Sequence, residues 1–183
     1  MDRYYSQTIG SAVLTTTGIP VARIVEIVID TDTGKVAGFL LSPRGQYVLA
    51  TNDILFWDQH IFVHDEEDIL ETDEIIKVQD ILKKNISILR KKVFTKNGRY
   101  LGKVYDIGIN PKLFVLTKLA VAKNVLGLFP FDEKIIAHKN ILEIKNDRII
   151  VKDVDAKERV PEKARSAKEN FQIDIAPSTF KDL

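Results

Sequence analysis

The sequence contains no cysteine, and this absence excludes several kinds of chemistry. None of the 183 residues can form a disulfide bond, act as a thiolate nucleophile or bind a metal through a thiolate. Because nothing in the composition favours an oxidising compartment, we expect the protein in the cytoplasm.

Long hydrophobic runs are missing as well. Residues 1–10 lack the apolar stretch of about 7–15 residues that a secretory signal needs. The most apolar segment, residues 113–131, is interrupted by Lys118, Lys123 and Asn124, whereas a membrane-spanning helix needs about 20 mostly apolar residues. We therefore expect no transmembrane segment, while a peripheral contact with a membrane stays open.

Signatures of catalysis and of metal binding are also lacking. The glycines of residues 98–103 are spaced too closely for a phosphate-binding loop, and no G-x-S-x-G segment exists. Residues 30–34 resemble the start of a calcium loop, but the glycine comes one position early, so we predict a turn. His60 and His64 would lie about 13 Å apart on a strand, too far for one ion. We expect no enzyme activity, no cofactor and no metal site.

Charge is balanced in total but uneven along the chain. The 27 basic and 26 acidic residues nearly cancel, yet residues 65–80 hold eight acids and one base. Residues 81–118 hold ten bases and one acid. The two blocks could neutralise each other across solvated surfaces. Alternatively, the basic block 81–118, which contains Phe94 and Tyr100, binds RNA by neutralising phosphates and stacking on bases.

An internal repeat organises the chain. Positions in the first half recur 80 residues later, and the offset rises to 87 and then 88 residues toward the end. The matched positions include Val13 with Val93, Gly18 with Gly98, Glu26 with Asp106, and residues 61–63 with residues 149–151. The second copy therefore carries extra residues, most simply within residues 123–134. Since Glu26 and Asp106 occupy the same position in two copies, we expect solvent-exposed carboxylates rather than a catalytic pair.

Each copy is predicted to consist of short β-strands, because β-branched and aromatic residues cluster between turn residues. The alternating pattern predicts which side chains face a core: Val25, Ile27 and Ile29 in the first copy, and Tyr105, Ile107 and Ile109 in the second. The residues between them, such as Val28 and Asp106, are predicted to face outward.

A short helix is predicted between the copies. Apolar residues follow helical spacing within residues 74–85, and Thr72 or Asp73 is available as the N-cap. The predicted organisation is a first copy in residues 1–70, a linker helix in 71–86, a second copy in 87–155 and a polar tail in 156–183. Both order and disorder of the tail stay open.

The repeat resembles the PRC-barrel domain. Residues 18–30 and 33–39 are similar to the opening of that domain, residues 98–106 are a closer match, and residues 61–63 and 149–151 resemble its last strand. The resemblance implies an all-β fold of two small antiparallel β-barrels in tandem. It also implies a role in assembly rather than catalysis, as a non-enzymatic module that binds another macromolecule. We expect a protein partner first, with an RNA- or ribosome-associated role through the basic block as the alternative.

An apolar segment within the extra residues is the candidate partner-binding site. Its large side chains are Leu126, Leu128, Phe129 and Phe131. Such residues are costly to leave in water, so either the protein or a partner covers them. A protein, a membrane surface and a second copy of the chain stay open as occupants, as does a role in covering the barrel.

Overall fold

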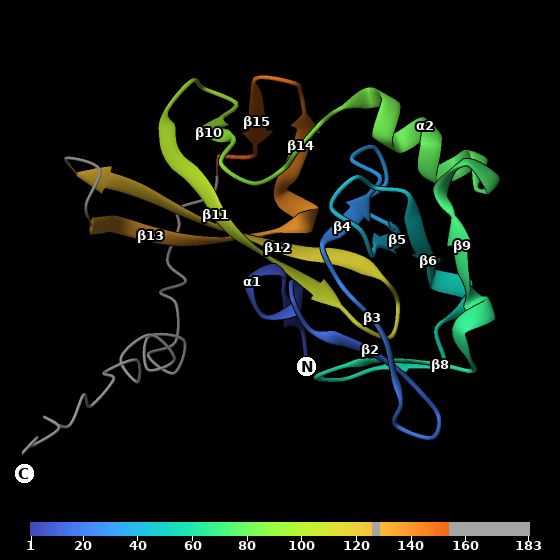
Figure 1. Ribbon diagram of the computed structural model, residues 1–183. Helices are drawn as coiled ribbons and strands as arrows, with labels where there is room; N and C mark the ends of the chain where they lie inside the picture. Colours follow the sequence, from blue (N-terminus) through green and yellow to red (C-terminus); the bar gives the residue numbers. More distant parts are fainter. Residues whose placement is uncertain (126–128, 154–183) are drawn as a thin grey trace, which may run out of the picture.

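The computed structural model describes residues 1–125 and 129–153, and nearly half of these residues lie in β-strands, far more than lie in helices (Figure 1). The predicted all-β fold class is thereby confirmed. The predicted tail, residues 156–183, lies outside the described residues. The first copy contains β2 (Ala12–Thr15), β3 (Pro20–Arg23), β4 (Glu26–Ile29), β5 (Val36–Leu40), β6 (Tyr47–Ala50), β7 (Phe56–Trp57), β8 (Ile61–Val63) and β9 (Ile69–Glu71). The second copy contains β10 (Lys92–Thr95), β11 (Tyr100–Asn110), β12 (Val115–Val125), β13 (Phe129–Ala137), β14 (Ile141–Ile144) and β15 (Arg148–Val151).

Strand pairing confirms the register of the internal repeat. In the first copy β2 pairs with β8 and places Val13 opposite Ile61. In the second copy β10 pairs with β15 and places Val93 opposite Ile149. These four residues are the ones that the sequence offsets match, so equivalent residues make equivalent pairs.

The same pairs show that the prediction of purely antiparallel barrels is wrong in one respect. β2 runs parallel to β8, and β10 runs parallel to β15, whereas the other strand pairs are antiparallel. Parallel neighbours need a long crossover connection, and the intervening strands of each copy supply it. Side-chain alternation reports which face a residue occupies but not the direction of the neighbouring strand, so the sequence could not show this.

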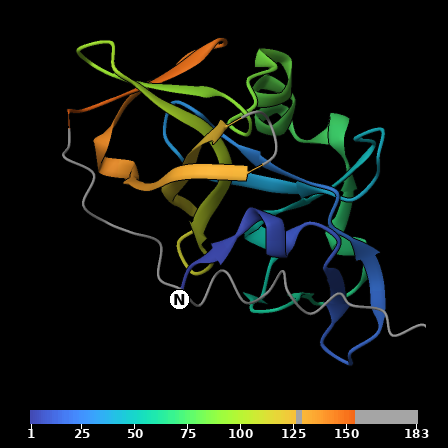
Figure 2. The same cartoon turned by 90° about the vertical axis from the view of Figure 1, so that its left-hand side faces the viewer.

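The two copies lie side by side, the first toward the right and the second toward the upper left in both views (Figures 1 and 2). They meet through equivalent turns. Lys35 forms an antiparallel bridge with Val115, its counterpart 80 residues later. The Val36 N–H donates to the Phe114 carbonyl (2.7 Å), and the Leu116 N–H donates to the Gly34 carbonyl (2.8 Å). Because each bond is the counterpart of the other, the contact has the reciprocity of a two-fold interface.

One hydrophobic core spans both copies. A single cluster of buried side chains includes Val13 and Phe39 from the first copy together with Val93 and Leu119 from the second. An aromatic contact crosses the junction: Trp57, which packs edge-on against Phe39 within the first copy (ring centroids 5.0 Å), lies parallel to Phe114 of the second (6.0 Å). The tandem barrels therefore stabilise each other by shared burial.

The linker helix α2 (Ile76–Lys84) packs on the outer face of the first copy's sheet β4–β5–β6–β9. Val78 of α2 and Val28 of β4 belong to a second apolar cluster. Val28, predicted to face outward, is only 3% exposed because α2 covers it. The predicted N-cap is also wrong: Thr72 lies in the preceding 3-10 turn (Thr72–Glu74), and Ile75 occupies the N-cap position. The helix ends at Lys84, and Asn85 after it adopts the left-handed conformation (φ 51°) common at helix C-termini.

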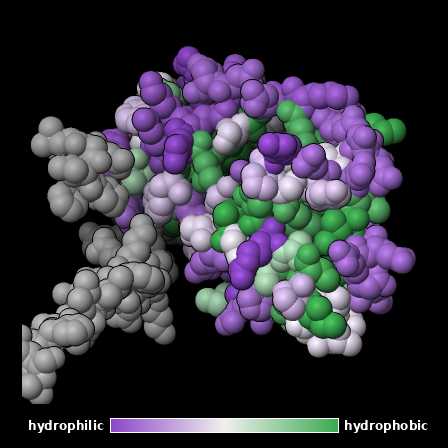
Figure 3. Space-filling view, in the orientation of Figure 1, coloured by the Kyte–Doolittle hydropathy of each residue, from purple (hydrophilic) through white to green (hydrophobic). Residues whose placement is uncertain are grey.

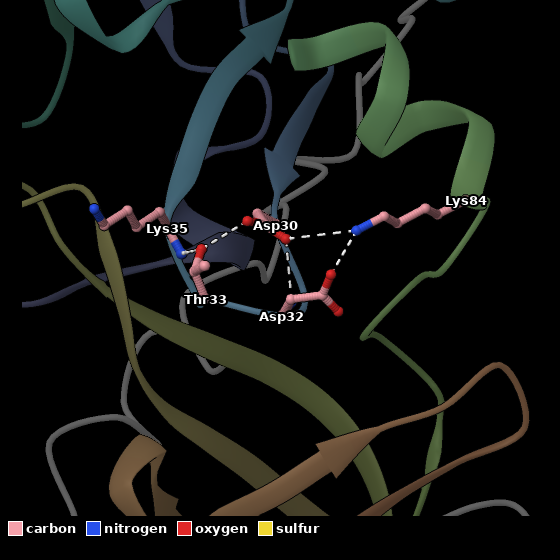
Figure 4. A network of polar contacts seen from close by, with 5 residues as sticks. All are labelled: Asp30, Asp32, Thr33, Lys35 and Lys84. Carbon is pink, nitrogen blue, oxygen red and sulfur yellow. Dashed lines mark hydrogen bonds and ion pairs between the residues drawn. The ribbon is translucent and has the colours of Figure 1, made fainter.

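A polar network attaches the end of α2 to the turn between β4 and β5 (Figure 4). The Lys84 ammonium lies 2.6 Å from the Asp32 carboxylate and 4.0 Å from that of Asp30. The Asp30 carboxylate accepts hydrogen bonds from the Thr33 hydroxyl (2.7 Å) and the Asp32 N–H (3.1 Å). Partial burial alone would raise the pKa of Asp30, but these bonds and Lys84 together hold that pKa below its usual value. Residues 30–34 thus form a turn, as predicted, with Gly34 in the left-handed region (φ 72°).

β11 contains a bulge that corrects the predicted facing of its residues. The register with β12 shifts between Val104 and Asp106, so Tyr105 is an extra residue in the strand. Tyr105, predicted to face the core, is 45% exposed, and Asp106, predicted to be solvent-exposed, is only 9% exposed. Ile107 and Ile109 are buried as predicted. One extra residue inverts the facing of the residues before Asp106, which exposes Tyr105. Asp106 itself follows the bulge and is buried because the N-terminal segment covers it, with Ser6 donating to its carboxylate.

The N-terminal segment connects the two equivalent carboxylates. Strand β1 (Arg3–Tyr4) pairs with β11 of the second copy, and the short helix α1 (Tyr5–Thr8) follows it. The Tyr5 hydroxyl donates to Glu26 (3.0 Å), while the N–H and hydroxyl of Ser6 donate to Asp106 (3.1 and 2.5 Å). Glu26 is exposed, as predicted, so the two carboxylates differ in burial although they are equivalent in the repeat.

Candidate functional site: a basic groove on the second copy

The predicted apolar site lies at the end of the β12–β13 hairpin. Leu126 and Leu128 lie outside the described residues, and Phe129 and Phe131 belong to β13, where their backbones pair with Val125 and Lys123. This hairpin is longer than its counterpart β5–β6 and extends away from the rest of the protein (Figure 1, left). The extra residues of the second copy thus lengthen a hairpin, and partner binding by the four apolar side chains stays a prediction.

The described part of the second copy carries a different candidate, an open groove of about 500 Å³ that we call the basic groove. Five of its lining residues are basic and one is acidic. The lining residues are Asn85, Ser87, Leu89, Arg90, Lys91, Lys92, Phe94, Lys103, Asn146, Asp147 and Arg148. In Figure 3 the surface over β10 and β15, at the top of the view, is predominantly hydrophilic.

Three neighbouring strands place three cations in one row across the groove. On the central strand β10, Lys92 stands directly opposite Lys103 of β11 and directly opposite Arg148 of β15. Residues in direct register share one face of a sheet, and like charges so placed destabilise it. We call Lys103, Lys92 and Arg148 the cation row. All three side chains are exposed, so the row presents its charge to solvent.

Lys91 shapes one wall of the groove from within the protein. It is only 9% exposed, and its ammonium donates to the carbonyls of Lys145 (2.7 Å) and Asn146 (2.8 Å). Burial lowers the pKa of Lys91, and the nearby carboxylate of Asp147 opposes that shift. The lysine therefore holds the β14–β15 turn against the strand that carries Lys92.

An aromatic surface adjoins the cation row. The Arg148 guanidinium lies 5.7 Å from the centre of the Phe94 ring, and the Phe94 and Tyr100 rings are 5.3 Å apart. Arg148 also pairs with Asp147 (2.6 Å), whose pKa is lowered by that hydrogen bond. Asp147 is the only carboxylate among the lining residues, so the groove keeps a surplus of positive charge.

Arg90 adopts a backbone conformation that arginine rarely takes. Its φ is 64°, in the left-handed region, and its N–H donates to the Val104 carbonyl (2.8 Å). At the equivalent position of the first copy stands Gly10, with φ 83° and a hydrogen bond to the Ile24 carbonyl of the same length. The turn is thus the same in both copies, and glycine would form it without a Cβ penalty.

The first copy serves as an internal comparison for the groove. The five basic residues of the groove have these counterparts in the first copy: Gly10 for Arg90, Ser11 for Lys91, Ala12 for Lys92, Arg23 for Lys103 and His60 for Arg148. The strands and their pairings are the same, but most of the charge is absent. The cations therefore belong to the second copy's own sequence and are not required by the fold.

The comparisons with known proteins agree with the repeat. Residues 1–81 and 87–157 each match the PRC-barrel domain. The chain belongs to the PRC-barrel family. Its two matched stretches confirm a tandem arrangement of PRC-barrel domains. None of the curated proteins searched matches the chain.

PRC-barrel domains are generally non-catalytic, and the described part of this PRC-barrel protein shows neither a metal-ligand cluster nor a membrane-spanning helix. In residues 1–125 and 129–153, no group of three or more His, Asp or Glu side chains could hold a metal ion. Within the same ranges, no helix is long and apolar enough to cross a membrane.

The sequence indicated most of this groove but not all of it. Four of its cations belong to the basic block 81–118, whereas Arg148 does not. The signal that could have found Arg148 is the repeat itself, since the matched last strand places it next to β10. Other bases of the block have different partners: Lys84 pairs with Asp32, and Lys118 pairs with Asp2 (2.9 Å).

Proposed function

We propose that this PRC-barrel protein is a non-enzymatic module that binds an anionic macromolecule through the basic groove. The observation that carries the proposal is the cation row, in which Lys103, Lys92 and Arg148 stand in direct register. The row destabilises the sheet by charge repulsion, and a bound anion relieves that repulsion.

The conformation of Arg90 supports the same function. An arginine kept where the fold accepts glycine lowers the stability of the free protein. Within the described residues, Arg90 forms no side-chain hydrogen bond or ion pair that would offset its backbone cost. Such costs are expected where binding, rather than folding, requires the residues.

A protein partner is the second candidate, and a surface of the first copy favours it. On the sheet β3–β2–β8–β7, Leu14 stands opposite Phe62, which stands opposite and stacks on Phe56 (ring centroids 4.1 Å). Phe56 is 53% exposed. An exposed aromatic strip on a sheet edge is typical of protein-binding surfaces.

The absence of cysteine and the macromolecular partner are consistent with a protein that acts in the cytoplasm.

The binding of base-free polyanions tests the main proposal. We expect the full chain to bind inorganic polyphosphate and heparin, with log K falling linearly as log salt concentration rises, because binding displaces counterions. The test variant combines Arg90→Gly, Lys92→Ala and Arg148→His, which are the residues of the first copy at these positions. It should lose most of this binding and its salt dependence.

A matched control removes the same number of charges elsewhere. Arg44→Ala, Lys112→Ala and Lys139→Ala change exposed cations that do not line the groove. This control should bind almost as tightly as the unchanged protein. Equal losses in the two triple variants would mean that the net charge, and not the groove, accounts for binding, and the proposal would be wrong.

A further inference from the structure

Resting on the proposed function, we infer that the anion bound in the basic groove is a single-stranded nucleic acid. Its phosphates contact the cation row, and an unpaired base stacks on the aromatic surface formed by Phe94 and Tyr100. The chemistry that selects this ligand is the combination of cations and aromatic rings on one face of the sheet.

The strand geometry places both kinds of group together. Phe94 lies two residues after Lys92 on β10, and side chains two apart on a strand share a face. Phe94 stands opposite Tyr100 of β11, and the Arg148 guanidinium lies over one face of the Phe94 ring. Positively charged grooves with aromatic side chains are typical of proteins that bind single strands, because every unpaired base offers a stacking face.

The alternatives use less of this surface. In a duplex the faces of the bases are stacked on each other, so Phe94 would have no base to contact. Inorganic polyanions and acidic peptides without aromatic residues have no planar ring and would engage the cation row alone. Only a strand with unpaired bases uses the phosphate contacts and the aromatic rings at once.

The comparison between the copies supports this pairing of features. At the positions of Phe94 and Tyr100 the first copy has Leu14 and Pro20. The second copy thus combines the cation row with an adjoining aromatic pair, whereas the equivalent sheet of the first copy has an aromatic pair at other positions, Phe56 and Phe62, and no cation row beside it. Since the buried residue between them is valine in each copy (Val13 and Val93), the difference concerns the outward face and not the core.

Binding of oligonucleotides of about 10 residues to the full chain tests the inference, since one binding site of this kind covers roughly 4–16 nucleotides. Fluorescence anisotropy would compare single-stranded oligo(U) and oligo(dT), a duplex of equal length, polyphosphate and poly-glutamate. We expect either single strand to bind more tightly than the duplex and both base-free polymers. The tighter of the two single strands would identify the sugar that the groove prefers.

The variant Phe94→Leu isolates the stacking. Leucine occupies the equivalent position of the first copy, so the fold tolerates it on the same face. Single-strand affinity should fall by roughly 5- to 150-fold, the range for losing one base stack, while polyphosphate affinity stays the same. The matched control Phe62→Leu removes an aromatic ring from the outward face of the first copy and should leave both affinities unchanged.

The outcomes separate this inference from the proposed function. If polyphosphate still binds through the cations but Phe94→Leu leaves single-strand affinity unchanged, the stacking inference is wrong and the proposed function stands. Tighter binding of the duplex, or of poly-glutamate, would likewise overturn the inference. If no polyanion binds the groove, both are wrong.

Discussion

Replacing Arg90 with glycine should make the protein more stable and a weaker binder of anions. Arg90 has φ 64°, and an L-residue in this region costs about 1–2 kcal/mol compared with the right-handed conformation. Glycine avoids that cost but loses more conformational freedom on folding, which offsets about 0.4–1 kcal/mol. We therefore expect Arg90→Gly to raise the free energy of unfolding by about 0.5–1 kcal/mol.

The expected change is measurable by two methods. For a chain of this size, 1 kcal/mol shifts the melting temperature by about 2–4 °C, so Arg90→Gly should melt about 1–4 °C higher in a calorimetric scan. Urea unfolding should show a higher midpoint with the same slope. Polyphosphate affinity should fall at the same time. The negative slope of log K against log salt concentration should become shallower by roughly 0.7 if Arg90 contacts one phosphate of a flexible chain.

Phe114 provides the control, because it is also left-handed (φ 51°) at a position where the first copy has glycine, Gly34. Its strain is offset within the protein, since its ring stacks on Trp57 across the junction of the copies. Phe114→Gly should therefore destabilise the fold by about 1–3 kcal/mol, the cost of a large-to-small change at a half-buried site. A lower melting temperature for Arg90→Gly, or unchanged anion binding, would refute the argument that binding retains this arginine.

Three further predictions concern the core, the junction and the acid stability. Ile27→Asp and Ile107→Asp should each destabilise the protein by several kcal/mol in thermal melts, because each buries an unpaired charge in the shared cluster. A mutant that melts like the parent would show that its residue does not belong to the shared core. The two copies, expressed as separate chains of residues 1–86 and 87–183, should associate in analytical ultracentrifugation, because the reciprocal contacts and the shared core cross the junction. Two monomers that do not associate would contradict the shared core. The lowered pKa of Asp30 means that its interactions stabilise the fold above the usual carboxyl pKa of 3.8 and are lost as pH falls through the lower folded value. Asp30→Asn should thus reduce stability near pH 7 and weaken its decline below about pH 4 in urea titrations, and an unchanged pH profile would contradict the role of this turn.

Several features of the fold could be predicted from the sequence because they depend on local pattern. The offsets between the copies predicted that Val13 and Val93 occupy equivalent positions, and the strand pairs confirm it. The helical spacing in residues 74–85 predicted a linker helix, which the structure places at Ile76–Lys84. Alternation predicted the burial of Ile27 and Ile107. Periodicity and repeats are properties of neighbouring residues, so they can be read without knowledge of long-range contacts.

Other features depend on neighbours that are distant in sequence. Val28 is buried because α2 covers its strand, and Tyr105 is exposed because a register shift against β12 inserts one residue. The basic groove is of the same kind. The sequence alone determined two copies of a PRC-barrel repeat and a block of positive charge in the second. Only the tertiary structure decided that Arg148 joins Lys92 and Lys103 in one row, because strand pairing brings together residues that the chain separates.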